Sequence, residues 1–214
     1  MSEQPRKESR GQLFVISAPS GAGKTSLVRA LMEPSNTIGV AISHTTRAKR
    51  PEETDGINYH FVTEVEFNDL VDRGEFLESA TVFEHLYGTS TSAVNLILHQ
   101  GKHLVLEIDW QGAAQVRQKL PGTQSIFIFH PSLGALRDRL ENRGQDDVET
   151  VDKRMSAAFE ELSHWHEFDY LIVNDQFDTA LAQLQAVVAG EGANYHRNRQ
   201  SKALGQLIEN LLPQ

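Results

Sequence analysis

The chain has 214 residues, enough for one sizeable core with small insertions and too few for two full domains. Its formal net charge of −9 argues against general nucleic-acid binding, and the absence of cysteine excludes disulfides, thiolate catalysis and cysteine–zinc sites. Residues 1–10 are polar and expected to be disordered, and because neither they nor any later segment has the apolar run of a signal peptide or membrane span, we predict a cytoplasmic protein.

The first predicted elements are a buried strand at residues 12–17 and a helix at residues 25–32, joined by a glycine-rich loop. The loop, Ala18-Pro-Ser-Gly-Ala-Gly-Lys-Thr25, matches the phosphate-binding pattern G-x-x-x-x-G-K-S/T except that alanine replaces the first glycine. Its glycines let backbone N–H groups converge on one point, where the dipole of the following helix adds positive charge. The pattern predicts a nucleotide site in which Lys24 reaches the β- and γ-phosphates and Thr25 ligates Mg²⁺. A glycine-rich surface turn capped by a lysine is the alternative.

Strands and helices then alternate along the chain. Further buried strands are predicted at residues 38–43, 103–109, 125–130 and 170–174. Helical periodicity is found at residues 92–100, 111–119, 133–142, 148–165 and 177–189. This order predicts an α/β fold with a mainly parallel sheet flanked by helices, and ligands at the carboxyl ends of the strands.

Three segments depart from the alternation. Residues 46–94 contain short segments separated by turn signals, which predicts a small subdomain inserted into a main domain at residues 11–190. Residues 137–154 are rich in charges of both signs, typical of a mobile lid. A helical extension is predicted at residues 191–214, where Leu204, Leu207, Ile208 and Leu211 form an apolar face. That face packs either on the core or against a second copy in a homo-oligomer, and the sequence leaves both open.

Two carboxylates stand at the end of a predicted apolar strand at residues 103–109. Asp109 stands at the end of that strand, and Glu107 points the same way by the period of two. Phosphate-loop proteins hold Mg²⁺ with a carboxylate in this position, so either residue could serve the metal, partly through water. The alternative is a pair of solvent-exposed acids.

Arginines gather in two further segments. Arg47 and Arg50, near Tyr59 and Tyr87, suit a second anion such as a nucleoside monophosphate, although a basic run is often only a solvated face. Arg139 and Arg143 are four residues apart and so share one helix face, which together with Arg154 could cover a transferring phosphoryl group. For that helix taken alone, a surface laced with ion pairs is the favoured interpretation.

The order and spacing of these motifs resemble the guanylate kinase family, in particular its bacterial members. The resemblance extends from Gln12 to Leu184 and includes the phosphate loop, Ser43-His-Thr-Thr-Arg47, Phe76-Leu-Glu78, Tyr87-Gly-Thr89, Glu107-Ile-Asp109-Trp-Gln-Gly112 and Ile172-Val-Asn174-Asp175. It implies a P-loop fold with a GMP-binding insertion and an arginine-rich lid. The residues implied for ATP are Ala18, Pro19, Ser20, Gly21, Ala22, Gly23, Lys24, Thr25, Ser26, Arg143 and Asn174. Those implied for GMP are Ser43, Arg47, Arg50, Glu53, Tyr59, Glu78, Tyr87, Thr89 and Asp109.

The reaction implied by the resemblance is transfer of the ATP γ-phosphoryl group to GMP, and also to dGMP, within purine metabolism and GMP recycling. Catalytic roles fall to Lys24, Arg47, Arg139, Arg143 and Arg154, with Mg²⁺ held by Thr25, Glu107 and Asp109. ATP and GMP are the expected partners, with no nucleic acid or membrane. Glu78 suits guanine because one carboxylate can accept hydrogen bonds from N1–H and the 2-amino group.

Three rival functions are weaker. A catalytically dead scaffold module of the same fold typically loses phosphate-loop residues, whereas Lys24, Thr25 and Asp109 are all present here. A GTPase switch is disfavoured because the sequence contains no Asn-Lys-x-Asp guanine signature. A kinase for another nucleoside monophosphate is disfavoured by Glu78.

Overall fold

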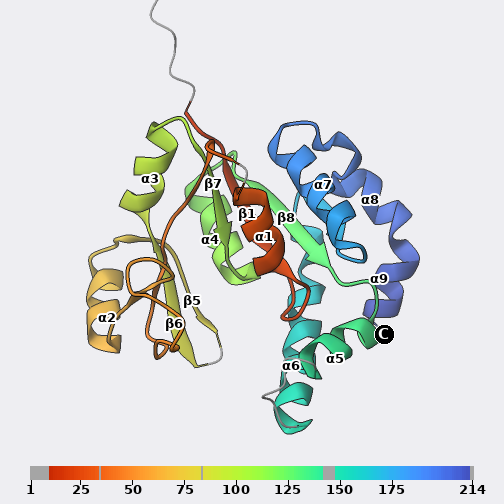
Figure 1. Cartoon of the computed structure of the whole chain (residues 1–214), viewed down its shortest axis with the longest axis horizontal. Helices are drawn as coiled ribbons and strands as arrows, with labels where there is room; N and C mark the ends of the chain where they lie inside the picture. The colour runs from red at the N-terminus through yellow and green to blue at the C-terminus, as the bar shows by residue number, and fades with distance from the viewer. Residues whose placement is uncertain (1–9, 34, 83, 142–147, 213–214) are drawn as a thin grey trace, which may run out of the picture.

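The structure is a computed structural model that describes residues 10–33, 35–82, 84–141 and 148–212. It is a mixed α/β fold with two sheets, and the predicted fold class is confirmed (Figure 1). The larger sheet has five strands in the order β2-β7-β1-β8-β9, with every neighbouring pair parallel. Its strands are β1 (Leu13–Ser17), β2 (Ile38–Val40), β7 (His103–Glu107), β8 (Gln124–Phe129) and β9 (Tyr170–Val173).

Helices cover both faces of this sheet, as the alternating pattern predicts. The helices on its faces are α1 (Lys24–Met32), α3 (Thr91–His99), α4 (Trp110–Lys119) and α7 (Phe177–Val188). Helices α5 (Leu133–Glu141) and α6 (Val148–Ser163) pack mainly on each other. The central strand β1 is buried throughout: Leu13 and Val15 face the cluster with α3 and α4, whereas Phe14 and Ile16 face the cluster with α1 and α7. A strand that is apolar on both sides is what a parallel sheet between two helical layers requires.

The smaller sheet lies beside the larger one and has the order β4-β3-β6-β5. Its strands are β3 (His44–Thr45), β4 (His60–Phe61), β5 (Phe76–Val82) and β6 (His85–Ser90), and it is accompanied by α2 (Glu64–Asp72). A capping box starts α2, since Thr63 accepts from the Glu66 N–H and the Glu66 carboxylate accepts from the Thr63 N–H. The sheet spans nearly the same residues as the predicted insertion, 46–94.

One predicted strand is wrong in extent. Residues 38–43 were expected to be one buried strand, but β2 ends at Val40. The chain then leaves the larger sheet, and β3 begins at His44 in the smaller one. An apolar run therefore continued across the connection between two sheets, where sequence periodicity alone does not mark a boundary.

The C-terminal segment returns to the core through α8 (Arg197–Ala203) and α9 (Gly205–Leu211), after short 3₁₀ turns at Trp165–Glu167 and Gly192–Asn194. Leu211 is 1% exposed, and Leu204, Leu207 and Ile208 pack against the same core cluster. This apolar face therefore packs at least in part on the core of the same chain, and the homo-oligomer stays a prediction. Across the described segments, no helix combines the length and the apolar character needed to cross a membrane.

Candidate active site

The phosphate-binding loop connects β1 to α1 at the carboxyl edge of the larger sheet. Gly21 and Gly23 have φ angles of 86° and 85°, a left-handed conformation that glycine adopts without strain. A Cβ on Gly23 would lie 2.4 Å from Nδ2 of Asn174, so the loop also needs glycine for close packing. The loop lines a cavity of about 220 Å³ with eight predicted residues, namely Ala18, Pro19, Ser20, Gly21, Gly23, Lys24, Thr25 and Ser26.

Asn174 holds the phosphate-binding loop in place through a hydrogen bond to its backbone. The resemblance implies that Asn174 binds ATP; in the structure it is buried, and its Nδ2 donates to the carbonyl of Ala22 at 2.7 Å. The backbone carbonyl of Asn174 accepts a hydrogen bond from Nη2 of Arg139 at 3.1 Å. The second guanidinium nitrogen of Arg139, Nη1, is buried without a hydrogen-bond partner in the described structure. Asn174 and Arg139 thus connect the loop to α5.

The carboxyl end of β7 faces the loop, because Ile16 of β1 lies in register with Glu107. Thr25 Oγ1 donates to Oε1 of Glu107 at 2.5 Å, and Lys24 Nζ donates to the Ile108 carbonyl at 3.3 Å. Asp109 begins α4, where its Oδ1 accepts from the Gly112 N–H at 2.8 Å. Burial raises the pKa of Asp109, while the Gly112 N–H and the charge of Lys24 act in the opposite direction.

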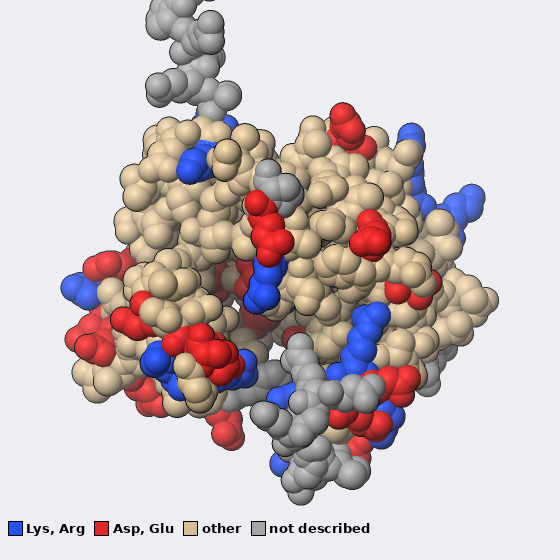
Figure 2. Space-filling view, viewed as in Figure 1, with Lys and Arg blue, Asp and Glu red and all other residues tan. Residues whose placement is uncertain are grey.

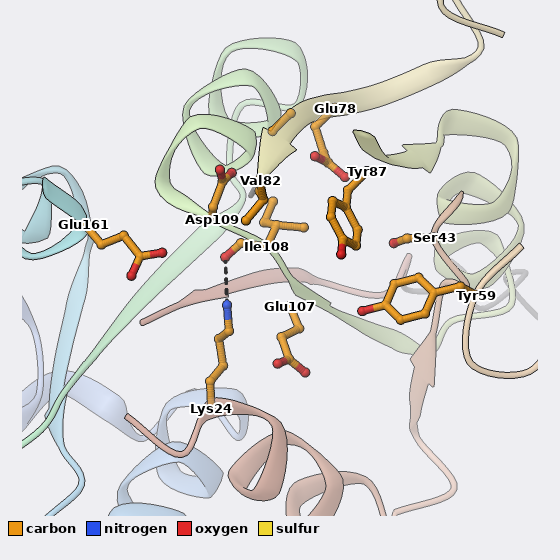
Figure 3. Close-up of a pocket in the computed structure, with 11 residues that line it drawn as sticks. Lys24, Ser43, Tyr59, Glu78, Val82, Tyr87, Glu107, Ile108, Asp109 and Glu161 are labelled. Carbon is orange, nitrogen blue, oxygen red and sulfur yellow. Dashed lines mark hydrogen bonds between the residues drawn. The ribbon is translucent and has the colours of Figure 1, made fainter. Parts of the chain in front are cut away.

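A second cavity, of about 210 Å³, lies between the two sheets. Figure 2 shows that the surface is hollowed between the parts of the molecule that carry them. Predicted residues reach this cavity from both sides (Figure 3): Ser43, Tyr59, Glu78 and Tyr87 from one, and Lys24, Glu107 and Asp109 from the other. Lys24 lines both cavities and so marks where they meet.

Three residues implied for guanine form one hydrogen-bonded chain. Thr89 Oγ1 donates to Glu78 Oε1 at 2.5 Å and lies 2.9 Å from the Ser43 hydroxyl. Glu78 and Thr89 are opposite each other in the β5–β6 ladder, which sets this geometry. Glu78 is only 2% exposed, and burial raises its pKa to about 7 although the Thr89 hydrogen bond favours the carboxylate.

The arginine cluster is organised by Glu53. Its carboxylate accepts from Nη2 of Arg47 at 2.7 Å and from the backbone N–H of Arg50 at 2.8 Å. The Arg47 guanidinium lies 5.6 Å from the centre of the Tyr59 ring, which in turn lies 5.9 Å from the Tyr87 ring. Burial raises the pKa of Tyr59, so its hydroxyl stays a hydrogen-bond donor at neutral pH. The Arg50 side chain is exposed, outside the cavity.

Of the predicted lid arginines, Arg139 lies on α5 beside Asn174, and Arg154 is half-buried on α6. Arg143 lies outside the described residues. Sequence reasoning missed Glu161, whose carboxylate lines both cavities. The available signal was spacing, since Glu161 follows Arg154 by seven residues and so shares its helix face.

A family model for guanylate kinase matches residues 10–191 of the chain. The chain belongs to the guanylate kinase family. It is 54% identical over 203 residues to the guanylate kinase of Alkalilimnicola ehrlichii, covering 94% of this chain and 98% of that one. For the guanylate kinase of Pseudomonas fluorescens Pf0-1 the identity is 53% over 204 residues, with 95% and 98% covered.

Structure comparison agrees with this assignment to the guanylate kinase family. The crystal structure of guanylate kinase from Anaplasma phagocytophilum superposes with a TM-score of 0.71 at 29% identity, over 94% of this chain and 97% of that one. The family resemblance found in the sequence is therefore confirmed, and with it the P-loop fold.

Proposed function

We propose that this chain transfers the γ-phosphoryl group of ATP to GMP, giving ADP and GDP. The observation that carries the proposal is the meeting of two cavities at Lys24, one lined by the phosphate loop and the other containing the buried carboxyl of Glu78. A donor phosphate in the first cavity and an acceptor phosphate in the second would then share one lysine. Family membership supports the same reaction.

Guanine selectivity follows from Glu78. Guanine offers N1–H and the 2-amino group as adjacent donors, and the carboxylate can accept from both. Adenine has a lone pair at N1 and lacks the 2-amino group, so it would leave a buried carboxylate unpaired. A site built to receive donors rejects such an analogue strongly, because it loses partners instead of a single contact.

The GMP phosphate is assigned to Arg47, Tyr59 and Tyr87, at the mouth of the second cavity. The planar guanidinium of Arg47 can bind two phosphate oxygens and fix their orientation. Because Glu53 holds Arg47 and the backbone of Arg50, we assign it to positioning this anion site.

Mg²⁺ is the proposed cofactor. The hydroxyl of Thr25 and the carboxylate of Glu107 are in contact, and two oxygen donors beside a phosphate loop fit this hard cation. Within the described ranges, no three His, Cys, Asp or Glu side chains form a metal cluster, which suits an ion that takes its remaining ligands from water and phosphates. When bound, Mg²⁺ would neutralise charge on the donor phosphates. Asp109 faces the same cavity and is assigned to orienting the ion's waters or the acceptor.

Catalysis by this site is positioning and charge stabilisation. The acceptor is already an oxyanion, so no general base is needed. Lys24 and the arginines supply positive charge to the transferring group, and an arginine in this role is worth roughly 10³–10⁵ in rate. Arg139 suits it because its Nη1 has no hydrogen-bond partner in the described structure. Arg47, Arg143 and Arg154 are assigned to the same role on the family resemblance.

The test is ADP formation from Mg·ATP with GMP, dGMP or AMP as acceptor. We expect rapid turnover with GMP, turnover with dGMP and little with AMP. Lys24→Ala should abolish it, whereas Lys102→Ala, which removes an exposed lysine, should not. A protein that binds GMP without phosphorylating it would refute the kinase and favour the scaffold function.

A further inference from the structure

Glu161 joins helix α6 to the phosphate-binding loop. Its Oε2 accepts a hydrogen bond from the backbone N–H of Ser20 at 3.0 Å. The carboxylate points into the space beside Asp109 and Lys24 (Figure 3) and lines both cavities. The two partners are separated by 141 residues along the chain, so this bond links elements that have no local connection.

The environment of Glu161 favours a stable contact. Burial raises the pKa of its carboxyl, whereas the charge of Lys24 and the Ser20 N–H favour the carboxylate. A partly buried carboxyl without such partners would lose hydration and receive nothing in return. The Ser20 N–H therefore holds this side chain in one place.

Helix α6 packs mainly on α5, and an ion pair between Asp152 and Arg137 of α5 joins the two helices. Residues Val151, Met155 and Ala158 of α6 pack on α5 in a small cluster that is separate from the two main core clusters. Near its end, Leu162 enters the main core. The α5–α6 cluster is thus separate from the cores on the large sheet, and the bond from Glu161 to Ser20 ties α6 to the phosphate-binding loop.

Arg154 lies on the same face of α6 as Glu161. Seven residues make almost two full turns, so their side chains project in the same direction about 10.5 Å apart along the axis. Glu160, one residue before, is exposed on a different face. Holding Glu161 on the loop therefore also sets the side of the molecule toward which this face of α6, with Arg154 on it, is turned.

We propose that Glu161 is a positioning residue: its hydrogen bond to the Ser20 amide sets the rotation of α6 so that Arg154 faces the transferring phosphoryl group. This inference rests on the proposed function, in which the loop holds ATP. The positioning role depends on the length of the Glu161 side chain and on its acceptor oxygen, and not on its charge.

Two substitutions of Glu161 separate the effect of its side-chain length from the effect of its charge. Glu161→Gln keeps the length and an acceptor oxygen but removes the charge, whereas Glu161→Asp keeps the charge and is too short to reach Ser20. We expect Glu161→Gln to retain kcat within about threefold of wild type and Glu161→Asp to lose at least tenfold, with KM for GMP changed less than threefold. Glu160→Gln is the matched control and should behave as wild type.

A double-mutant cycle tests whether the effect passes through Arg154. If it does, adding Glu161→Asp to Arg154→Ala should lower kcat by less than threefold beyond Arg154→Ala alone, because the two changes remove the same contribution. Thermal melting of each variant shows whether it is folded. If Glu161→Asp does not fold, a loss of kcat beyond threefold in Glu161→Gln still contradicts the inference.

Three results would overturn the inference: wild-type kcat in Glu161→Asp, equal impairment of both Glu161 variants, or fully multiplicative losses in the cycle. Failure of the proposed function looks different, since the wild-type chain would then produce no ADP in response to GMP.

Discussion

Glu78 is an ordinary acidic residue that lies in an unusually buried environment. In the sequence it is one acidic residue among 29, and only its place in the family pattern singles it out. In the fold it is almost fully buried, and burial raises its pKa to about 7. The side chain that we assign to guanine recognition therefore changes charge within the physiological range, and a proton competes with the purine for its oxygens.

GMP affinity should depend on pH for this reason. With a pKa of about 7 in the empty site, the carboxylate falls from about 90% of molecules at pH 8 to about 10% at pH 6, so the Kd for GMP should rise about tenfold. Calorimetric titration at several pH values measures it. In Glu78→Gln, where binding is weaker, any remaining pH dependence reports the titration of the GMP phosphate. An equal dependence in both proteins would contradict the assignment.

Some functional residues were predictable from their own motif and others were not. Lys24 and Thr25 stand in a pattern that carries its own geometry, and both line the predicted cavity. Asn174 is different, because its contact with Ala22 joins segments 152 residues apart that only folding brings together. Glu53 contacts Arg47 and Arg50 within six residues, but its own residue type and spacing form no motif. Glu161 was not predicted: its spacing from Arg154 places both on one helix face, but gives no sign of a contact 141 residues away.

At the scale of elements, segments with a clear apolar pattern were predicted, whereas half-exposed segments of the insertion were not. Four of the five strands of the larger sheet and helices α1, α3, α4, α5, α6 and α7 occur close to their predicted ranges, whereas β2 is shorter than predicted. Helix α2 and the pair β5–β6 were described only as an insertion, since α2 buries only Phe67 and both strands are partly exposed, which weakens their apolar periodicity. The Thr63–Glu66 capping box was nevertheless present in the sequence as a helix start.

The first turn of α4 lies against β5, and Gly112 allows that approach. A Cβ there would lie 2.7 Å from Oε2 of Glu78 and 3.3 Å from Oδ1 of Asp109. Gly112→Ala should therefore displace the Glu78 carboxyl and raise KM for GMP about tenfold or more, as steady-state kinetics can measure. Gly134→Ala is the control in α5, where the nearest atom to a new Cβ is 3.8 Å away, and its activity should be unchanged. A wild-type KM for GMP in Gly112→Ala would contradict this prediction, since α4 and β5 could then move apart without disturbing the Glu78 carboxyl.

Across the whole molecule, the two sheets are the largest structural units, and the second cavity is built from both. The larger sheet has a continuous core on each face, completed by the C-terminal helices. The overall α/β class could be predicted because alternation implies it, whereas the covering of the C-terminal apolar face could not. Both a core contact and a subunit contact satisfy the same amphipathic pattern.

Ligands that touch both sheets should draw them together. We expect the radius of gyration, measured by small-angle X-ray scattering, to fall when GMP and a non-hydrolysable ATP analogue bind with Mg²⁺, because closure excludes water from the reaction. Lys24→Ala should lose the part of the change that the ATP analogue causes and keep the part caused by GMP. An unchanged radius with both ligands bound would mean that the ligand-free arrangement is already closed.

The chain enters and leaves the smaller sheet at two points that lie close together. The chain enters it at Ser43 and leaves it just after Thr89, and the hydroxyl oxygens of these two residues are 2.9 Å apart. A unit whose ends meet in this way can be exchanged as a cassette without reconnecting the surrounding core. Acceptor preference can therefore evolve, or be engineered, by replacing the segment between these two residues while the phosphate-donor half stays the same.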